Sequence, residues 1–280
     1  MAFKEGDLVS RKSYNGDILF KITKITGNQA FLKGVDYRLW ADAPLKDLIL
    51  PTREKIQDYR VAVKKLESSC MKNIFQRRSR ELKTRWKGSS NDAIEIPGKV
   101  LHLDGDREYL GECLKAYATL GIPARGEYIM EKDQPGAVSD LLEEHRPDLL
   151  VLTGHDAYMK KGKDDFRDIN RYRNSRFFLA GVMEARRYEP AKDDLVIFAG
   201  GCQSFYEALM DAGANFASSP QRVLIHCLDP VFVLEKVCLT TIKRSVKVKD
   251  AVESSITGLE GLGGIETRGK FRLGLPKSPY

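Results

Sequence analysis

The fold follows from two apolar stretches, DLLVLT at residues 148–153 and DLVIFA at residues 194–199. Both are short and rich in branched aliphatic residues, which is typical of strands buried on both faces of a parallel sheet. Further strands are expected at residues 99–103, 125–130, 223–227 and 269–274. Helical patterns alternate with them, at residues 107–120, 137–144, 175–188, before Met210 and at 231–243. This alternation predicts an α/β domain with a mainly parallel sheet flanked by helices, from residue 94 to 280.

Two smaller parts precede that domain. Residues 1–50 hold short β patterns at 7–10, 18–25 and 29–34, separated by glycine and asparagine turns, and predict a small SH3-like β-barrel. Such a barrel binds a partner or docks on the neighbouring domain. Residues 51–93 contain a single glycine and many good helix formers, so a helical connector is expected over residues 53–86, followed by a linker at 88–92.

The net charge of +7 is concentrated in the connector. Residues 51–90 contain twelve basic and four acidic side chains, so the rest of the chain is close to neutral. A solvated helical face explains this pattern. The alternative is a nucleic-acid or anionic-surface binding module on an inactive α/β scaffold, which steeply salt-dependent binding would distinguish.

Composition excludes several classes of protein. Hydrophobic residues make up 42% of the chain, but no stretch approaches the roughly 18 apolar residues of a membrane span. The first residues, MAFKEGD, carry acidic side chains where a signal peptide is apolar, so a cytoplasmic protein is expected. The five cysteines are odd in number and lack C-x-x-C spacing, and the four histidines are scattered. We therefore expect free thiols, no metal and no cofactor.

Reactive side chains follow the predicted strands. His155 comes directly after the stretch at 148–153, and Cys202 follows the one at 194–199. Ligands bind beyond the carboxyl ends of the strands in open α/β sheets, so these two side chains are expected to meet there. Gly200 and Gly201 allow a sharp turn, whose amides can stabilise an oxyanion, and a helix beginning at Cys202 would lower the pKa of its thiol. A cysteine–histidine pair suits acyl transfer. The alternatives are a buried structural cysteine and a phosphate-binding turn.

The remaining histidines and cysteines have weaker claims. His102, His226 and Cys227 lie within predicted strands and are expected in the core or near the site. Asp156 either orients His155 or caps its loop.

The order of these motifs resembles the caspase–gingipain–legumain group of cysteine peptidases, in which apolar strands end at the catalytic histidine and cysteine. That group usually has glycine directly after the histidine, whereas here Gly154 precedes His155. The resemblance implies that Asp104 and Asp106 lie near the first substrate pocket, where an acid favours a basic residue before the cleaved bond. Turn formation is their alternative role, and Asp229 is a further candidate acid.

Longer blocks resemble the YabG family, the sporulation-specific cysteine peptidases of endospore-forming bacteria. These blocks are FKEGDLVSRKSY (3–14), KVLHLDGD (99–106), VLTGHDAY (151–158), LVIFAGGCQS (195–204), AGANFASSP (212–220) and GLGGIETRG (261–269). The resemblance implies a catalytic pair of His155 and Cys202. It also implies processing of spore coat proteins and precursors of germination proteins in the mother cell, at the spore coat. With basic specificity, the connector becomes an expected self-cleavage segment, at Arg77, Arg78 or Arg80.

Overall fold

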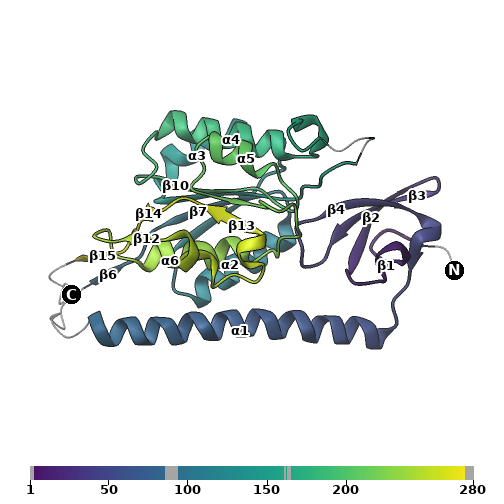
Figure 1. Ribbon diagram of the computed structural model, residues 1–280, viewed down its shortest axis with the longest axis horizontal. Helices are drawn as coiled ribbons and strands as arrows, with labels where there is room; N and C mark the ends of the chain where they lie inside the picture. Colours follow the sequence, from purple (N-terminus) through teal and green to yellow (C-terminus); the bar gives the residue numbers. More distant parts are fainter. Residues whose placement is uncertain (1–2, 86–93, 161, 163–164, 275–280) are drawn as a thin grey trace.

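The computed structural model describes residues 3–85, 94–160, 162 and 165–274. Its centre is a six-stranded sheet in the order β13-β11-β10-β9-β7-β8 (Figure 1). The strands are β7 (Val100–Asp104), β8 (Ala124–Tyr128), β9 (Leu149–Thr153), β10 (Val196–Ala199), β11 (Phe216–Ser218) and β13 (Leu262–Gly264). All neighbours pair in parallel except β13, which is antiparallel to β11. The mixed α/β fold with a mainly parallel sheet is therefore confirmed.

Helices cover both faces of this sheet (Figure 1). One face packs on α3 (Gln134–His145), α4 (Ser175–Tyr188) and α5 (Tyr206–Asp211), through an apolar cluster that includes Leu150, Phe178 and Leu209. The other face packs on α2 (Arg107–Thr119) and α6 (Asp229–Leu239), around Val151, Phe198 and Phe232. Because β9 and β10 contribute buried side chains to both clusters, they are apolar at every position.

The N-terminal part is a five-stranded antiparallel sheet in the order β4-β3-β2-β1-β5. Its strands are β1 (Leu8–Arg11), β2 (Phe20–Thr26), β3 (Gln29–Gly34), β4 (Trp40–Pro44) and β5 (Leu48–Ile49). Alternate residues of β2 and β3 point into a separate small core, which explains the period-two pattern of the sequence. The predicted β-domain is present, while its SH3-like closure stays a prediction.

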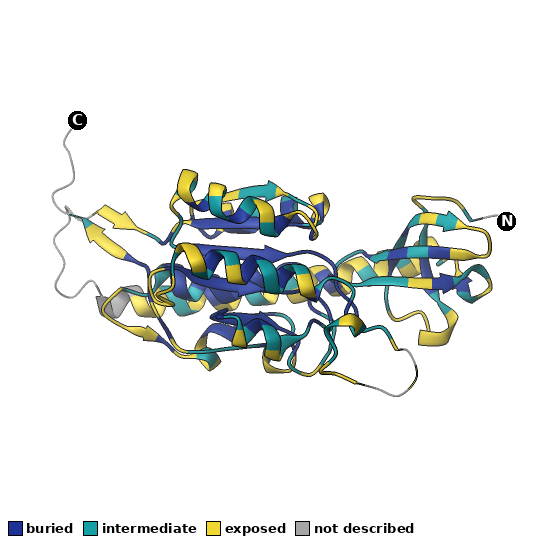
Figure 2. Ribbon diagram, turned by 90° about the horizontal axis from the view of Figure 1, so that it is seen from above, coloured by how far each residue is buried: buried dark blue, intermediate teal, exposed yellow. Residues whose placement is uncertain are grey.

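The connector is one helix, α1 (Arg53–Arg85), which runs along the length of the molecule beside α2 and α6 (Figures 1 and 2). It is packed against the chain rather than solvated all round. Ile74 is fully buried, Arg77 pairs with the buried Glu235 of α6, and Arg78 donates to the carbonyl of Leu120 at 2.9 Å. The expected linker at 88–92 lies outside the described residues. No helix in the described part of the chain is both long and apolar enough to cross a membrane.

One predicted strand is corrected. Residues 223–227 were expected to form the fifth strand of the sheet, but that place belongs to β11, and His226 and Cys227 lie in a loop before α6. The apolar side chains of this loop are buried in a core cluster of the α/β domain, against which Tyr37 and Leu39 pack, so burial rather than sheet pairing explains their character. The strand expected at residues 269–274 forms over β15 (Arg272–Gly274), which pairs with β6 (Ile94–Ile96) beside the main sheet. Short strands β12 (Ser245–Val246) and β14 (Thr267–Arg268) flank α7 (Val248–Val252).

Candidate active site

The two residues of the predicted pair follow adjacent parallel strands. β9 pairs with β10 in a register that sets Leu152 beside Ala199, so the turns after the two strands leave the same edge of the sheet. The turns touch, because a Cβ atom on Gly201 would lie 2.7 Å from the carbonyl oxygen of Gly154. Strand order therefore brings His155 and Cys202 to one place.

Cys202 is fully buried, and its thiol faces Ile225. The Ile225 amide donates to Sγ at 3.1 Å, and the Ile225 carbonyl oxygen lies 3.6 Å from the same sulfur. Burial raises the pKa of the thiol. The predicted lowering by a helix N-terminus is wrong, because α5 begins only at Tyr206 and Cys202 lies in the preceding turn.

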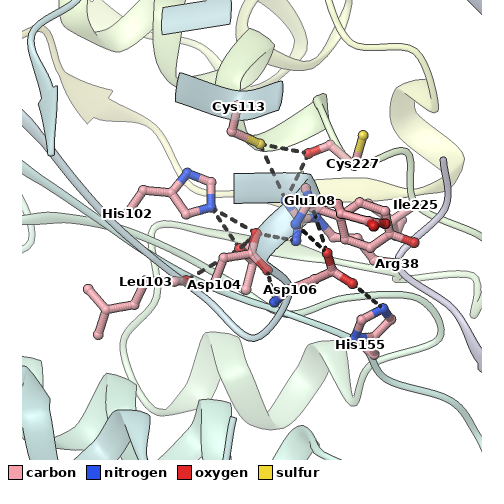
Figure 3. A network of polar contacts seen from close by, with 12 residues as sticks. Arg38, His102, Leu103, Asp104, Asp106, Glu108, Cys113, His155, Ile225 and Cys227 are labelled. Atoms are coloured by element: carbon pink, nitrogen blue, oxygen red, sulfur yellow. Dashed lines mark hydrogen bonds and ion pairs between the residues drawn. The ribbon is translucent and has the colours of Figure 1, made fainter. Parts of the chain in front are cut away.

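His155 is held between two carboxylates. Its Nε2 lies 3.3 Å from Asp106 Oδ2 (Figure 3). Its Nδ1 lies 3.6 Å from Glu131 Oε1. Burial opposes protonation, but the two nearby carboxylates together raise the pKa of His155 above its usual value. The rings of Trp40 and Tyr109 pack on the imidazole, each with its centroid 5.3 Å away. Among the described residues, no hydrogen bond joins His155 to Cys202.

Two amides converge on one carbonyl oxygen between these residues. The backbone N–H groups of Cys202 and Asp156 both donate to the carbonyl of Arg38, each at 3.2 Å. The amide of Gly201, predicted as the second donor, donates instead to Ser204 Oγ at 2.9 Å. The amide directly after the histidine thus takes part, although the residue there is aspartate rather than glycine. Such a pair of amides has the geometry of an oxyanion hole.

Asp104 lies at the centre of a buried network of polar contacts. Its Oδ2 accepts from Arg38 Nη1 at 2.6 Å and from Thr153 Oγ1 at 3.0 Å, with His102 Nε2 at 3.3 Å. Arg38 Nη2 donates to the carbonyl of Cys227 at 2.8 Å (Figure 3). Burial opposes ionisation of Asp104, but the Arg38 charge lowers its pKa to about 2. This network thus holds a guanidinium that has no exposure to solvent.

The carboxylates of the other predicted acids have different partners. Asp106 caps α2 and contacts Lys33 Nζ at 2.6 Å as well as His155. Asp156 accepts from the Asn174 amide and from the Ser175 and Ser204 hydroxyls, and burial raises its pKa to about 6. Its side chain therefore holds the loop instead of orienting the imidazole.

Asp229 is buried at the start of α6. It holds the loop before α6, because its carboxylate accepts from the His226 amide at 3.0 Å and from the Ile256 amide at 2.7 Å. Burial raises the pKa of Asp229 to about 6.

The glycines fit the tight turns. Gly200 has φ +110°, in the region that favours glycine, and a Cβ there would lie 2.5 Å from Ser218 Oγ. A Cβ on Gly154 would collide with the Glu131 carboxylate.

Several contributors to the site were missed by sequence reasoning. Arg38, Trp40 and Lys33 come from the N-terminal part, and Glu131 comes from the turn after β8. The signal available for Arg38 was a single basic residue inside the apolar and aromatic run Tyr37-Arg38-Leu39-Trp40. Nothing local in the sequence links that run to the ends of strands more than 60 residues away.

Two groups of side chains in the described residues have metal-ligand composition. In the group of His102, Asp104 and Cys113, the Arg38 guanidinium already supplies the cation. In the group of Asp36, Glu67 and His226, His226 Nδ1 accepts the Leu228 amide at 3.2 Å. The neutral imidazole then carries its proton on Nε2, the atom that faces Glu67, and offers no lone pair there. Neither group fits a metal ion.

The whole chain is similar to a family of known proteins. The family model described as YabG peptidase U57 matches residues 4–276. The sporulation-specific protease YabG of Bacillus subtilis (strain 168) is 42% identical over 288 residues, covering 99% of this chain and 99% of that relative.

Proposed function

Because the chain belongs to the YabG family of sporulation-specific proteases, we propose that it is a cysteine endopeptidase whose catalytic pair is Cys202 and His155. One observation carries the proposal. The Cys202 and Asp156 amides converge on a single carbonyl oxygen directly beside the Cys202 backbone, which is the arrangement that thiol acyl transfer needs. The caspase-like relationship of the α/β domain is part of the same proposal and is supported by the strand-end positions of the pair.

The mechanism follows from these groups. His155 accepts the Sγ proton of Cys202, and the sulfur attacks the substrate carbonyl carbon in the position that Arg38 occupies. The carbonyl π electrons move to oxygen, where the Cys202 and Asp156 amides stabilise the negative charge. The tetrahedral intermediate collapses, the C–N bond breaks, and His155 gives its proton to the leaving amine. Water then hydrolyses the thioester, releasing the acid and restoring the thiol.

Asp106 and Glu131 have a defined part in this cycle. Both carboxylates lie beside the imidazole and favour its protonated form, so they stabilise the imidazolium that arises when the thiol loses its proton. Because each ring nitrogen faces a carboxylate here, the imidazole has to turn one nitrogen toward Cys202 for the proton transfer.

The substrate is proposed to carry a basic residue before the cleaved bond. The support is the pocket over Asp104, whose buried carboxylate and the Cys227 carbonyl both bind a guanidinium. A neutral side chain would leave the buried Asp104 charge unpaired, which is costly. Arginine fits this geometry better than lysine, because its planar fork reaches both acceptors at once.

The biological substrates proposed are spore coat proteins and precursors of germination proteins, processed in the mother cell and at the coat. The protease name of the family supports protein substrates, and the family's sporulation-specific character supports the setting. We further propose that the chain has three parts, residues 1–50, 51–93 and 94–280. The first part is SH3-like and recruits substrate or docks on the assembling spore coat.

Self-cleavage in the connector is also proposed, at Arg77, Arg78 or Arg80. These residues lie within α1, and peptidases bind extended backbone, so cleavage there requires local unwinding of the helix. The nucleic-acid alternative has less support, because Arg77 and Arg78 are engaged in contacts within the chain.

The test compares the wild type with Cys202→Ala and His155→Ala, each mixed with spore coat extract and with an arginyl fluorogenic peptide. Cys70→Ala is the matched control, because Cys70 is a partly buried thiol in α1, outside the site. The proposal requires fragments and fluorescence with the wild type and the control only. Cleavage that persists in Cys202→Ala would remove this thiol from the mechanism.

A further inference from the structure

The segment between β3 and β4 leaves the N-terminal sheet and enters the candidate active site. The Cys227 amide donates to the Asp36 carbonyl at 2.8 Å, and the Arg38 amide donates to the Ile225 carbonyl at 2.9 Å. Tyr37 thereby forms an antiparallel bridge with His226. Residues 36–38 are thus bound as a short extended strand along the loop before α6, the mode in which peptides add to an exposed strand.

The same segment occupies the oxyanion position. The Arg38 carbonyl oxygen accepts the Cys202 and Asp156 amides, and the next residue, Leu39, forms a parallel bridge with Asp156. The peptide bond after Arg38 therefore lies where the bond of a substrate is expected.

The Arg38 side chain takes the place of the basic side chain in the proposed specificity pocket. Its guanidinium pairs with Asp104 and donates to the Cys227 carbonyl, and the residue is 0% exposed (Figure 3). Backbone strand, oxyanion position and specificity pocket are three separate features of a substrate complex, and one segment of this chain satisfies all three.

We propose that residues 36–39 are a built-in occupant of the substrate cleft, so that the intact chain cleaves slowly and a substrate has to displace them. This inference rests on the proposed function and adds to it the means by which the site is kept closed.

The fold favours the bound segment over free substrate. The segment is tethered at both ends by paired strands, β3 before it and β4 after it. A short tether gives the bound segment an effective concentration on the order of millimolar. A free substrate can therefore displace it only by binding more tightly than the segment does, or after local loosening of the N-terminal sheet.

The bound segment also closes the site to solvent. Cys202 is 0% exposed and His155 is 2% exposed, and Trp40, at the start of β4, covers the imidazole. Cys202 Sγ contacts the Ile225 backbone and not His155. The segment is therefore bound in the cleft while the Cys202–His155 hydrogen bond is not formed.

The first experiment measures how fast iodoacetamide labels Cys202, by peptide mass, in the full-length wild type, Arg38→Ala and Arg53→Ala. This readout does not depend on peptidase activity. Arg53 is an exposed arginine at the start of α1 and serves as the control. We expect labelling at least tenfold faster in Arg38→Ala only. Equal labelling of Cys202 in all three proteins would overturn the proposal.

Removing Arg38 leaves Asp104 buried and unpaired, so a second variant keeps both. Tyr37→Cys with His226→Cys puts two thiols at a non-hydrogen-bonded antiparallel pair, where Cα atoms are about 4.5 Å apart and a disulfide fits. The oxidised protein should label at Cys202 at least tenfold more slowly than the reduced protein, and each single variant should be insensitive to reductant. Unchanged labelling on oxidation would contradict the proposal.

An arginyl fluorogenic peptide is assayed alongside to separate the two hypotheses. Faster labelling of Arg38→Ala together with faster cleavage supports both. Faster labelling without cleavage supports the occupant and refutes the peptidase. Cleavage by the wild type at the Arg38→Ala rate, with equal labelling, refutes the occupant and leaves the peptidase standing.

Discussion

Asp104→Asn is the substitution that tests the proposed specificity pocket most sharply. Both members of the Asp104–Arg38 pair are 0% exposed, and Oδ2 lies 2.6 Å from Nη1. Asparagine keeps the shape and one acceptor oxygen but removes the charge. Losing one partner of a buried, hydrogen-bonded charge pair costs about 2–5 kcal/mol, and the retained acceptor favours the lower end. A loss of about 2–3 kcal/mol corresponds to a drop of roughly 30- to 150-fold in kcat/KM.

The assay compares two peptides that differ only in having arginine or glutamine before the cleaved bond. It is run in the Arg38→Ala background, so that competition by the built-in segment is the same in every protein. The ratio of kcat/KM for arginine over glutamine should fall by the stated factor. Asp140→Asn, at an exposed position of α3, is the charge-matched control and should leave the ratio unchanged. An unchanged ratio in Asp104→Asn would refute the assignment of this pocket.

Three further substitutions test other parts of the account. Gly201→Ala puts a Cβ 2.7 Å from the carbonyl oxygen of Gly154 in the neighbouring turn, and the resulting shift of the site should lower kcat by about 100-fold. The control is Gly136→Ala, whose Cβ would have nothing within 4 Å and should leave kcat unchanged in the same peptide assay. The neutral imidazole of His155 must accept the thiol proton, so kcat/KM should fall as pH drops below its raised pKa. Asp106→Asn removes one carboxylate that raises this pKa and should move the acidic limb of the pH profile to lower pH; an unmoved limb would contradict the pairing. Arg77→Ala leaves a fully buried carboxylate of α6 unpaired, and should lower the free energy of unfolding by about 3 kcal/mol in chemical denaturation; no change would mean that α1 does not stabilise the α/β domain.

The strands that deliver the site were predictable from local pattern. β9 and β10 are uniformly apolar because both faces are covered, and the turns after them carry His155 and Cys202. Parallel strands place their carboxyl ends at one edge, so proximity of the two turns followed from topology alone. The error at residues 223–227 has the same origin, because an apolar run shows that a segment is buried without showing what covers it.

The contacts that fill and bury the site could not be predicted from local sequence pattern. These contacts join residues far apart in the sequence, above all Arg38 with Asp104 and Asp156. Only the folded chain shows that an arginine of the N-terminal part neutralises a carboxylate of the α/β domain. The prediction of a lowered thiol pKa failed for a related reason, because burial of Cys202 depends on segments that the local helix signal does not report.

The most direct test of the central claim is a peptidyl-arginyl chloromethyl ketone, which alkylates a catalytic thiol only after its arginine is bound. The wild type and Arg38→Ala are treated with the reagent and digested, and the adduct is located by mass spectrometry. We predict a single adduct on Cys202, formed faster in Arg38→Ala and prevented by His155→Ala. An adduct confined to Cys70, a thiol outside the site, would contradict the claim that Cys202 attacks peptides bound through arginine. Labelling of Cys202 at the same rate by an uncharged reagent would contradict it as well.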